Sequence, residues 1–381
     1  MKVVIALDSF KGSLTSFQAG TAVAEGAKRA FQRMEPVICP IADGGEGTVA
    51  ALVEGLDGTL ETVTVSDPLG RKIECTYGII PKTKTAVIEM SAAAGITLLT
   101  KAELNPMHTT TFGVGEMIAD AVQKGCRDFI IGIGGSATND GGIGMLQALG
   151  FGILDKGGRQ VPFGAKGLAE IETITAEHAM PELAACKFSV ACDVENPLCG
   201  AAGCSAVFAP QKGADQAMAA QMDQLLLNYA AKVKEVYPLS DCTCPGAGAA
   251  GGLGFAFMSF LNGKLEKGID LIINAVGFEK HLADADLVVT GEGRLDAQSV
   301  MGKTPSGIAK MAKRYNVPVI AFAGSVAKDA AICNQQGIDA FFSIAPGVCT
   351  LEEAMEYETA YENLANAAEQ VFRLVKTIKS L

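Results

Sequence analysis

The fold class can be inferred from Lys2-Val-Val-Ile-Ala-Leu-Asp8, which leads into the polar loop Ser9-Phe10-Lys11-Gly12-Ser13. Its unbroken apolar run predicts a strand buried on both faces, as in a parallel sheet. Apolar residues at helical spacing follow over 15–33, and a short strand over 37–41 runs into a predicted helix over 48–56. This β-α-β-α order predicts an α/β protein.

The C-terminal third of the chain has the same alternation. Predicted strands there cover 287–290, 318–323 and 341–344, and predicted helices cover 306–314, 329–336 and 351–378. Neither end of the chain is large enough to close a doubly wound sheet alone. We therefore predict one five-stranded parallel sheet in a domain assembled from residues 1–58 and 279–381.

The stretch between these parts, residues 59–278, changes character. Segments 59–65, 72–80 and 85–90 alternate like antiparallel strands, and they are followed by strands over 129–133 and 188–191 and helices over 114–124, 144–149 and 216–236. We predict a mixed-sheet α/β domain inserted into the first. Ligands of open α/β sheets bind outside the carboxyl ends of the strands, so the cleft between the domains is the expected site.

Composition excludes several classes of protein. Among 381 residues, 49% are hydrophobic, which is incompatible with disorder, and the net charge of −11 disfavours nucleic acid and anionic membranes as partners. Eleven scattered cysteines, without a C-x-x-C pair, favour a reducing compartment. With no signal-peptide pattern and no apolar run of about 20 residues, we expect a cytoplasmic protein. A homo-oligomer stays open.

Two loops at predicted strand ends combine carboxylates with a cation or with glycines. Asp8 and Lys11 lie three residues apart, a spacing that suits a metal or proton on one side and an anion on the other, or a plain surface turn. Asp43-Gly-Gly-Glu46-Gly-Thr48 opens a helix whose free N–H groups could meet an anion. Its two carboxylates favour Mg²⁺ over bare phosphate, although DGG is also a common turn.

Two further loops are rich in glycine. Gly132–Gly142 contains G-x-G-x-x-A, but no acidic ribose partner follows about 20 residues later, so a dinucleotide fingerprint is weakly supported. We interpret it as a nucleotide-phosphate cradle in which glycine amides, Ser136 and Thr138 donate. Gly246–Gly254 has no acids and suits either tight packing or another phosphate contact.

Carboxylates follow two more predicted strands. Asp193 comes just after one strand and is either a base or a loop acceptor. Thr290–Asp296 presents Glu292 and Asp296, and its continuation to Thr304 has Ala297 where a P-loop needs glycine. Strand-end carboxylates, glycine loops and local cations, namely Lys11, Arg71, Lys212 and Arg294, together suit phosphoryl transfer. A triad hydrolase lacks support, since there is no G-x-S-x-G.

Taken in order, the loops DSFKGSL, PIADGGEGT, DPLGR, GIGGSATNDGG, ACDVENPL, FAPQKGA, GAGAAGGLG and TGEGRLDAQS resemble the type I glycerate kinase family over essentially the whole chain. The resemblance implies a flavodoxin-like domain with a second domain inserted, and transfer of the γ-phosphoryl group of ATP to D-glycerate with Mg²⁺. In the bacterial members that the chain resembles, the 2-hydroxyl is commonly the acceptor, giving 2-phosphoglycerate. Leu7 and Gly12 depart from the Pro and Glu usual there, which predicts altered loop rigidity.

Site roles follow as hypotheses. Asp193 is the expected base, with Asp8 and Lys11 also catalytic. Substrate contacts are assigned to Ser9, Lys11 and Arg71. The nucleotide is assigned to Gly134, Gly135, Ser136 and Thr138. Mg²⁺ is assigned, directly or through water, to Asp43, Glu46, Glu292 and Asp296.

Alternatives stay open at this point. The enzyme could be a glycerate 3-kinase or a kinase of another small hydroxy acid, such as tartronate or a longer aldonate. An NAD-dependent hydroxy-acid dehydrogenase would use the glycine loops for a dinucleotide. A two-lobed protein that binds a sugar acid without chemistry is a different class.

Overall fold

The structure, a computed structural model, describes residues 1–300 and 303–379. The chain divides into two compact units. The first comprises Met1–Asp43, Ala50–Asp57 and Ile269–Leu381, and the second comprises Gly44–Val49 and Gly58–Gly268. The sequence-based boundaries at 58/59 and 278/279 differ from this division for Gly58 and for two short segments, 44–49 and 269–278.

The first unit is built on a parallel sheet of five strands in the order β13-β12-β11-β1-β2. The strands are β1 (Lys2–Leu7), β2 (Glu35–Ile38), β11 (Leu287–Leu295), β12 (Val319–Val326) and β13 (Ala340–Ser343). Numbered within this sheet, the order is that of a flavodoxin-like fold, with the long inserted segment between its second and third strands. The predicted doubly wound sheet made from both chain ends is confirmed.

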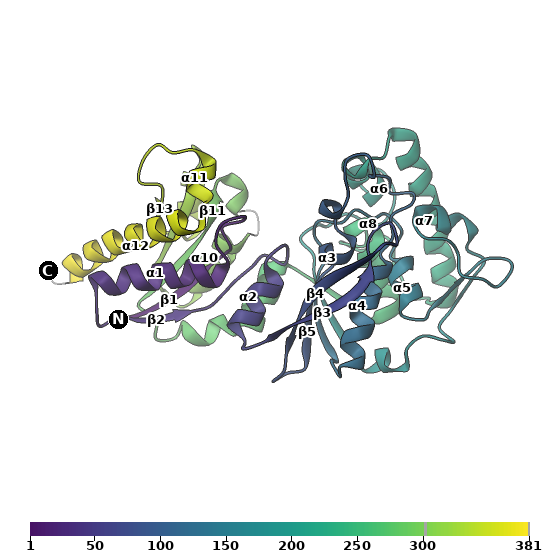
Figure 1. The fold of residues 1–381 in the computed structure, drawn as a ribbon, viewed down its shortest axis with the longest axis horizontal. Helices are drawn as coiled ribbons and strands as arrows, with labels where there is room; N and C mark the ends of the chain where they lie inside the picture. The colour runs from purple at the N-terminus through teal and green to yellow at the C-terminus, as the bar shows by residue number, and fades with distance from the viewer. Residues whose placement is uncertain (301–302, 380–381) are drawn as a thin grey trace. The chain divides into compact units, whose positions relative to one another are not determined.

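Helices cover both faces of this sheet. They are α1 (Ser16–Ala30), α2 (Thr48–Gly55), α9 (Gly268–Ala275), α10 (Thr304–Arg314), α11 (Leu351–Met355) and α12 (Tyr357–Lys379), with 3₁₀ turns η5 (Phe278–His281), η6 (Ala297–Val300) and η7 (Ala330–Gln336). α1 and α12 lie side by side (Figure 1), and their small residues pack with Val3, Ile5 and Leu7 in one core. Alternate residues of β1 point to the other face, and α10 contacts β1, β11 and β12.

Two helix ends show how local sequence sets element boundaries. α1 begins after Thr15, whose hydroxyl accepts from the backbone N–H of Gln18 while the Gln18 side chain accepts from Thr15, a capping box. The single helix predicted over 351–378 is wrong, because the chain is extended at Glu356, between α11 and α12. There the Glu356 carboxylate accepts the Thr359 hydroxyl at 2.8 Å, and α12 begins at the next residue, Tyr357.

The second unit is built on a mixed sheet in the order β10-β9-β6-β5-β4-β3. Its strands are β3 (Thr59–Ser66), β4 (Lys72–Ile80), β5 (Thr85–Glu89), β6 (Asp128–Gly132), β9 (Lys187–Ala191) and β10 (Lys264–Glu266). β3, β4 and β5 are antiparallel, whereas β5, β6, β9 and β10 are parallel. Glu89 is opposite Gly132, which is opposite Ala191, so three carboxyl ends form one edge.

The helices of the second unit enclose its apolar core. They are α3 (Ser91–Ala94), α4 (Phe112–Gln123), α5 (Ile143–Ala148), α6 (Cys204–Phe208), α7 (Gln216–Val236) and α8 (Ala249–Leu261), with the small hairpin β7 (Gly152–Leu154) and β8 (Thr173–Thr175). The 3₁₀ turns are η1 (Ile96–Leu98), η2 (Ala165–Glu170), η3 (Pro181–Ala185) and η4 (Pro210–Lys212). Within the described residues, no helix has the length and apolar composition needed to cross a bilayer.

Candidate active site

Two buried carboxylates belong to neighbouring strands in the first unit, near the carboxyl end of β1. Asp8 follows β1 directly, and Glu292 lies in β11 one residue beyond Gly291, the partner of Leu7. Asp8 is 5% exposed and Glu292 is 9% exposed. The Asp8 carboxylate accepts hydrogen bonds from the Ser9 N–H and the Thr304 hydroxyl, both at 2.7 Å.

Burial controls the protonation of these carboxylates. It raises the pKa of Asp8 to about 6, with the charge of Asp43 adding to the effect, while the Thr304 and Ser9 hydrogen bonds and the Lys11 charge oppose it. Burial also raises the pKa of Glu292 to about 7. Glu292 Oε1 has no hydrogen-bond partner among the described residues. Carboxylates with pKa values displaced toward neutrality are typical of functional sites.

The loop after Asp8 is a tight turn. Phe10 and Leu14 exchange backbone hydrogen bonds of 2.9 and 3.0 Å around it. Gly12 lies in the left-handed region, with φ +75°, where glycine is strongly favoured. The departure from the usual Glu therefore has a conformational role, and Lys11 is left exposed at the tip. A Cβ at Gly293 would lie 3.8 Å from Phe10 Cα, so this loop lies against β11.

In the second unit, two of the glycine loops meet at the carboxyl edge of the sheet. A Cβ at Gly132 would lie 2.4 Å from the carbonyl oxygen of Gly44, and one at Gly134 would lie 3.9 Å from Gly45 Cα. Gly134 and Gly135 are exposed, whereas Ser136 and Thr138 are buried. The exposed backbone of one loop thus lies beside the Gly44–Thr48 loop.

The Gly132–Gly142 loop is anchored from behind by buried side chains. The Asp140 carboxylate accepts from the Thr111 N–H and hydroxyl at 2.8 and 2.9 Å. Asn139 Nδ2 donates to Ser205 Oγ at 2.9 Å. Lys212, which the sequence suggests only as a local cation, donates to the loop from η4. These anchors make the loop rigid.

Glu89 is a site residue that sequence reasoning missed. Its carboxylate accepts from the Gly47 N–H at 3.1 Å and the Val49 N–H at 2.8 Å. Two N–H groups at the start of α2, expected to be available to an anion, are therefore occupied. Burial raises the pKa of Glu89. The available signal was its place at the end of the predicted strand 85–90, the same signal that marks Asp8 and Asp193.

The Gly246–Gly254 segment packs tightly against the glycine loop. A Cβ at Gly251 would lie 2.1 Å from the Thr138 carbonyl oxygen, and φ there is +66°. The Gly141 N–H donates to the Gly251 carbonyl at 2.9 Å. Of the two interpretations left open by the sequence, close backbone packing is the one that the structure supports.

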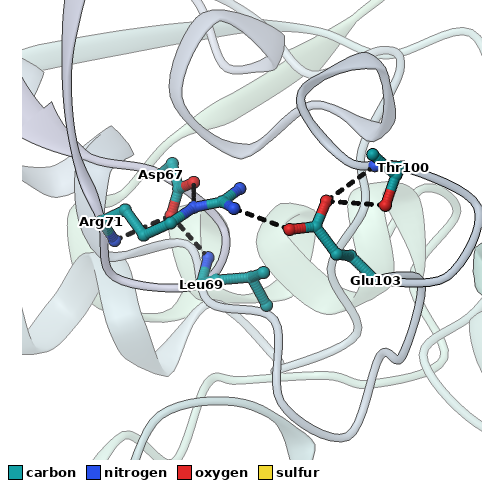
Figure 2. A network of polar contacts seen from close by, with 5 residues as sticks. All are labelled: Asp67, Leu69, Arg71, Thr100 and Glu103. Carbon is teal, nitrogen blue, oxygen red and sulfur yellow. Dashed lines mark hydrogen bonds and ion pairs between the residues drawn. The ribbon is translucent and has the colours of Figure 1, made fainter.

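Arg71 belongs to a network that Figure 2 shows around the β3–β4 turn. Its Nε donates to Asp67 Oδ2 at 2.5 Å, and its Nη1 donates to Glu103 Oε1 at 2.6 Å. Asp67 also accepts from the N–H groups of Leu69 and Arg71 and so fixes the turn. The guanidinium is half exposed but shared by two carboxylates, which sequence spacing could not predict because Glu103 comes from another loop.

The remaining candidates are distributed over both units. In the second unit, Asp193 is exposed after β9 and its Oδ1 accepts from the Gly268 N–H at 3.0 Å, and Glu46 is also exposed. In the first unit, Asp43 is half buried and Asp296 lies 3.4 Å from Arg294 Nε. Met301 and Gly302 of the P-loop-like stretch lie outside the described residues. Across residues 1–300 and 303–379, no group of three or more Asp, Glu, His or Cys is arranged to hold a metal ion.

Comparison with known proteins assigns the family. The sequence profile of the glycerate kinase family matches residues 3–376. The glycerate 2-kinase of Escherichia coli (strain K12) is 44% identical over 97% of each chain, and the glycerate kinase of Bacillus subtilis (strain 168) is 45% identical over 99% of each. A crystal structure assigned as a glycerate kinase 2 from Salmonella typhimurium LT2 covers both chains fully, with a TM-score of 0.93 and 43% identity. This chain is therefore an enzyme of the glycerate kinase family.

Proposed function

We propose that the enzyme transfers the γ-phosphoryl group of ATP to the 2-hydroxyl of D-glycerate, giving 2-phosphoglycerate and ADP. Two observations, one in each unit, carry the proposal. In the first unit, Asp8 follows β1 and Glu292 lies next to the partner of Leu7 in β11, and both are buried; in the second unit, an anchored glycine loop with exposed amides follows β6. Phosphoryl transfer depends on positioning and charge neutralisation, which these groups can supply.

The choice of substrate and hydroxyl rests on the relatives. Similarity to a glycerate 2-kinase over 97% of each chain favours glycerate and its 2-hydroxyl over a 3-kinase or a longer aldonate. Family membership decides against the dehydrogenase and against a binding protein without chemistry. The eleven cysteines are free thiols in the structure, which supports our further proposal of a cytoplasmic enzyme.

Mg²⁺ suits the oxygen donors of the proposed site. Our candidates stay Asp43, Glu292 and Asp296 in the first unit and Glu46 in the second. Glu292 Oε1, buried and without a hydrogen-bond partner in the described part of the chain, fits a cation, because an unpaired carboxylate oxygen is costly to bury. Mg²⁺ is commonly held by one or two carboxylates together with phosphate oxygens and water, so a dense protein cluster is not required. When bound, the ion neutralises phosphate charge.

The proposed roles of the chain's own residues follow from their surroundings. Lys11 is exposed and can approach an anion, so we assign it, with Ser9, to the glycerate carboxylate or the transferring group. Arg71 is the second cation proposed there, and its carboxylate partners fix its direction. Gly134, Gly135, Ser136 and Thr138 are assigned to the nucleotide phosphates. Asp193 is the proposed base that accepts the hydroxyl proton.

Phosphorus NMR of a reaction with D-glycerate, ATP and Mg²⁺ tests the function directly. A Mg²⁺-dependent 2-phosphoglycerate signal is expected. A 3-phosphoglycerate signal would keep the kinase and correct the hydroxyl, and no phosphorylated product from folded, ATP-binding protein would overturn the substrate.

Asp193→Asn tests the base. It keeps an oxygen acceptor for the Gly268 N–H but cannot take a proton, so kcat should fall by about 10² or more. An unchanged kcat would end this assignment.

A further inference from the structure

Lys212 has the most completely buried ammonium group described in the second unit. The side chain is 1% exposed, although lysine is rarely buried without partners. It projects from the short turn η4, which Gly213 closes with φ +97°, and a Cβ at Gly213 would lie 2.3 Å from the Leu104 carbonyl oxygen. The turn therefore holds the lysine in one inward direction.

Two hydrogen bonds join this ammonium to the glycine loop. Lys212 Nζ donates to Ser136 Oγ at 2.7 Å and to the Thr138 carbonyl oxygen at 2.6 Å. The two acceptors are two residues apart, so a single cation fixes the backbone and a side chain of the loop together. Hydrogen bonds from a charged donor are stronger and more directional than neutral ones.

The contact with Lys212 also determines what Ser136 can do. Because Ser136 Oγ accepts from Lys212, its hydroxyl proton is directed elsewhere, and the structure gives it no other partner among the described residues. Thr138 Oγ1 is buried and equally without a partner in the described chain. Both hydroxyls therefore have a donor without a partner in the described chain, and they belong to the same loop as the exposed Gly134 and Gly135.

We propose that Lys212 is the positioning residue of the nucleotide loop, holding Ser136 and Thr138 so that their hydroxyl groups donate to phosphate oxygens of ATP. This inference rests on the proposed function, which assigns the loop to the nucleotide. A purely structural role needs no charge, since a methionine fills similar space without the cost of desolvating an ammonium. The lysine acts through Ser136 and does not itself touch the substrate.

The charge of Lys212 gives the proposal a pH signature. Burial lowers the pKa of Lys212 to about 8, and the charge of the Asp140 carboxylate opposes this shift. The pKa of the Cys204 thiol is raised to about 11, so it stays neutral between pH 7 and 9. The Asp140 carboxylate is held by Thr111 and by the N–H groups of Gly142 and Gly144. A loss of ATP affinity from pH 7 to 9 therefore reports on the lysine.

Steady-state kinetics of Lys212→Met, Ser136→Ala and the double variant test the proposal. We expect the KM for ATP to rise about 10-fold in Lys212→Met, while the KM for D-glycerate stays within about 2-fold. Ser136→Ala should raise the KM for ATP less, and adding it to Lys212→Met should have little further effect, since both act on one contact. The rise in KM for ATP above pH 8 should disappear in Lys212→Met.

The proposal would be overturned if the rises in the KM for ATP of the two single variants multiplied in the double variant. It would also be overturned if the KM for ATP and the KM for D-glycerate rose equally in Lys212→Met. If Lys212→Met does not fold, the proposal is tested by the pH profile of ATP binding to the wild type and by the ATP affinity of Ser136→Ala. A wild-type profile that is flat to pH 9, together with unchanged ATP affinity in Ser136→Ala, would contradict the proposal. Wild-type turnover of D-glycerate tests the proposed function separately. If the wild type binds ATP but does not phosphorylate glycerate, the dissociation constant of ATP is measured for the same variants in place of KM. The same comparison then tests the role of Lys212.

Discussion

Replacing Asp8 by Asn should make the first unit more stable and the enzyme inactive. The carboxylate is 5% exposed, and its pKa rises from 3.8 to about 6 on folding. At about 1.4 kcal/mol for each pH unit, the buried charge destabilises the fold by about 3 kcal/mol. The amide keeps an oxygen for the Ser9 N–H and places its NH₂ beside the Thr304 oxygen, which can accept, so both observed contacts can persist.

The sign of the pH dependence follows from the direction of the pKa. Because the folded pKa lies above the unfolded one, the folded state binds more protons between pH 3.8 and about 6. The free energy of unfolding of the wild type therefore falls as pH rises through this window and is fully reduced above it. The Asp8→Asn variant escapes this loss, so its advantage should be about 3 kcal/mol at pH 8 and under 1 kcal/mol at pH 4.

Urea unfolding followed by far-ultraviolet circular dichroism, in EDTA and without nucleotide, measures the difference. Glu362→Gln, an exposed carboxylate of α12, is the matched control and should show no such pH-dependent gap. Turnover with D-glycerate should fall by about 10² or more in Asp8→Asn. An Asp8→Asn variant that is less stable than the wild type at pH 8, or a gap that is equal at pH 4 and 8, would refute the reasoning.

Three further substitutions test separate contacts. Thr304→Val should lower kcat about 10-fold, whereas kcat of Thr304→Ser should stay within about 3-fold of the wild type, because only serine keeps a hydroxyl donor for Asp8. Equal losses of kcat in the two variants would contradict this role. Gly251→Ala should lower the free energy of unfolding by about 3 kcal/mol in urea, because its Cβ would meet the Thr138 carbonyl oxygen. The control Gly125→Ala also has positive φ but open space around it, and its free energy of unfolding should fall by about 1 kcal/mol. Similar losses in the two variants would contradict the packing argument. In the same assay, Glu89→Ala should lower the free energy of unfolding by about 2 kcal/mol, because two backbone N–H groups lose their acceptor. Glu46→Ala, at an exposed carboxylate, should lower it by under 0.5 kcal/mol. A smaller loss in Glu89→Ala would show that the loop does not depend on this carboxylate.

The parallel sheet of the first unit could be predicted because its central strands are largely buried apolar runs. The Val3–Leu7 run is completely apolar, and such runs alternate with helical periodicity at both ends of the chain. Strand-end loops could be predicted for the same reason, since a carboxylate directly after an apolar run has to lie at the edge of the sheet. That rule located Asp8 and Asp193.

The contacts that organise the site could not be predicted from spacing. Thr304 and Asp8 are separated by 296 positions, and Lys212 and Ser136 by 76, so only tertiary structure brings them together. The break at Glu356 was missed because nothing but a side-chain hydrogen bond marks it. Arg71 was proposed as a local cation, but its ion pair with Glu103 could not be predicted because Glu103 comes from a different loop.

Buried charge is placed in this protein where stability alone would exclude it. Asp8, Glu292 and Lys212 are each at most 9% exposed, and burial displaces the pKa of each toward neutrality. Neutral side chains of similar size would avoid that cost. Asp8 follows the end of β1, Glu292 lies in β11 beside the partner of Leu7, and Lys212 holds a loop that begins at the end of β6. Ligands of α/β sheets bind at strand ends, and local violations of folding rules concentrate at functional sites. The positions of these charges fit the proposed function, in which each unit would contribute to binding the substrates of a kinase and the cation that accompanies them.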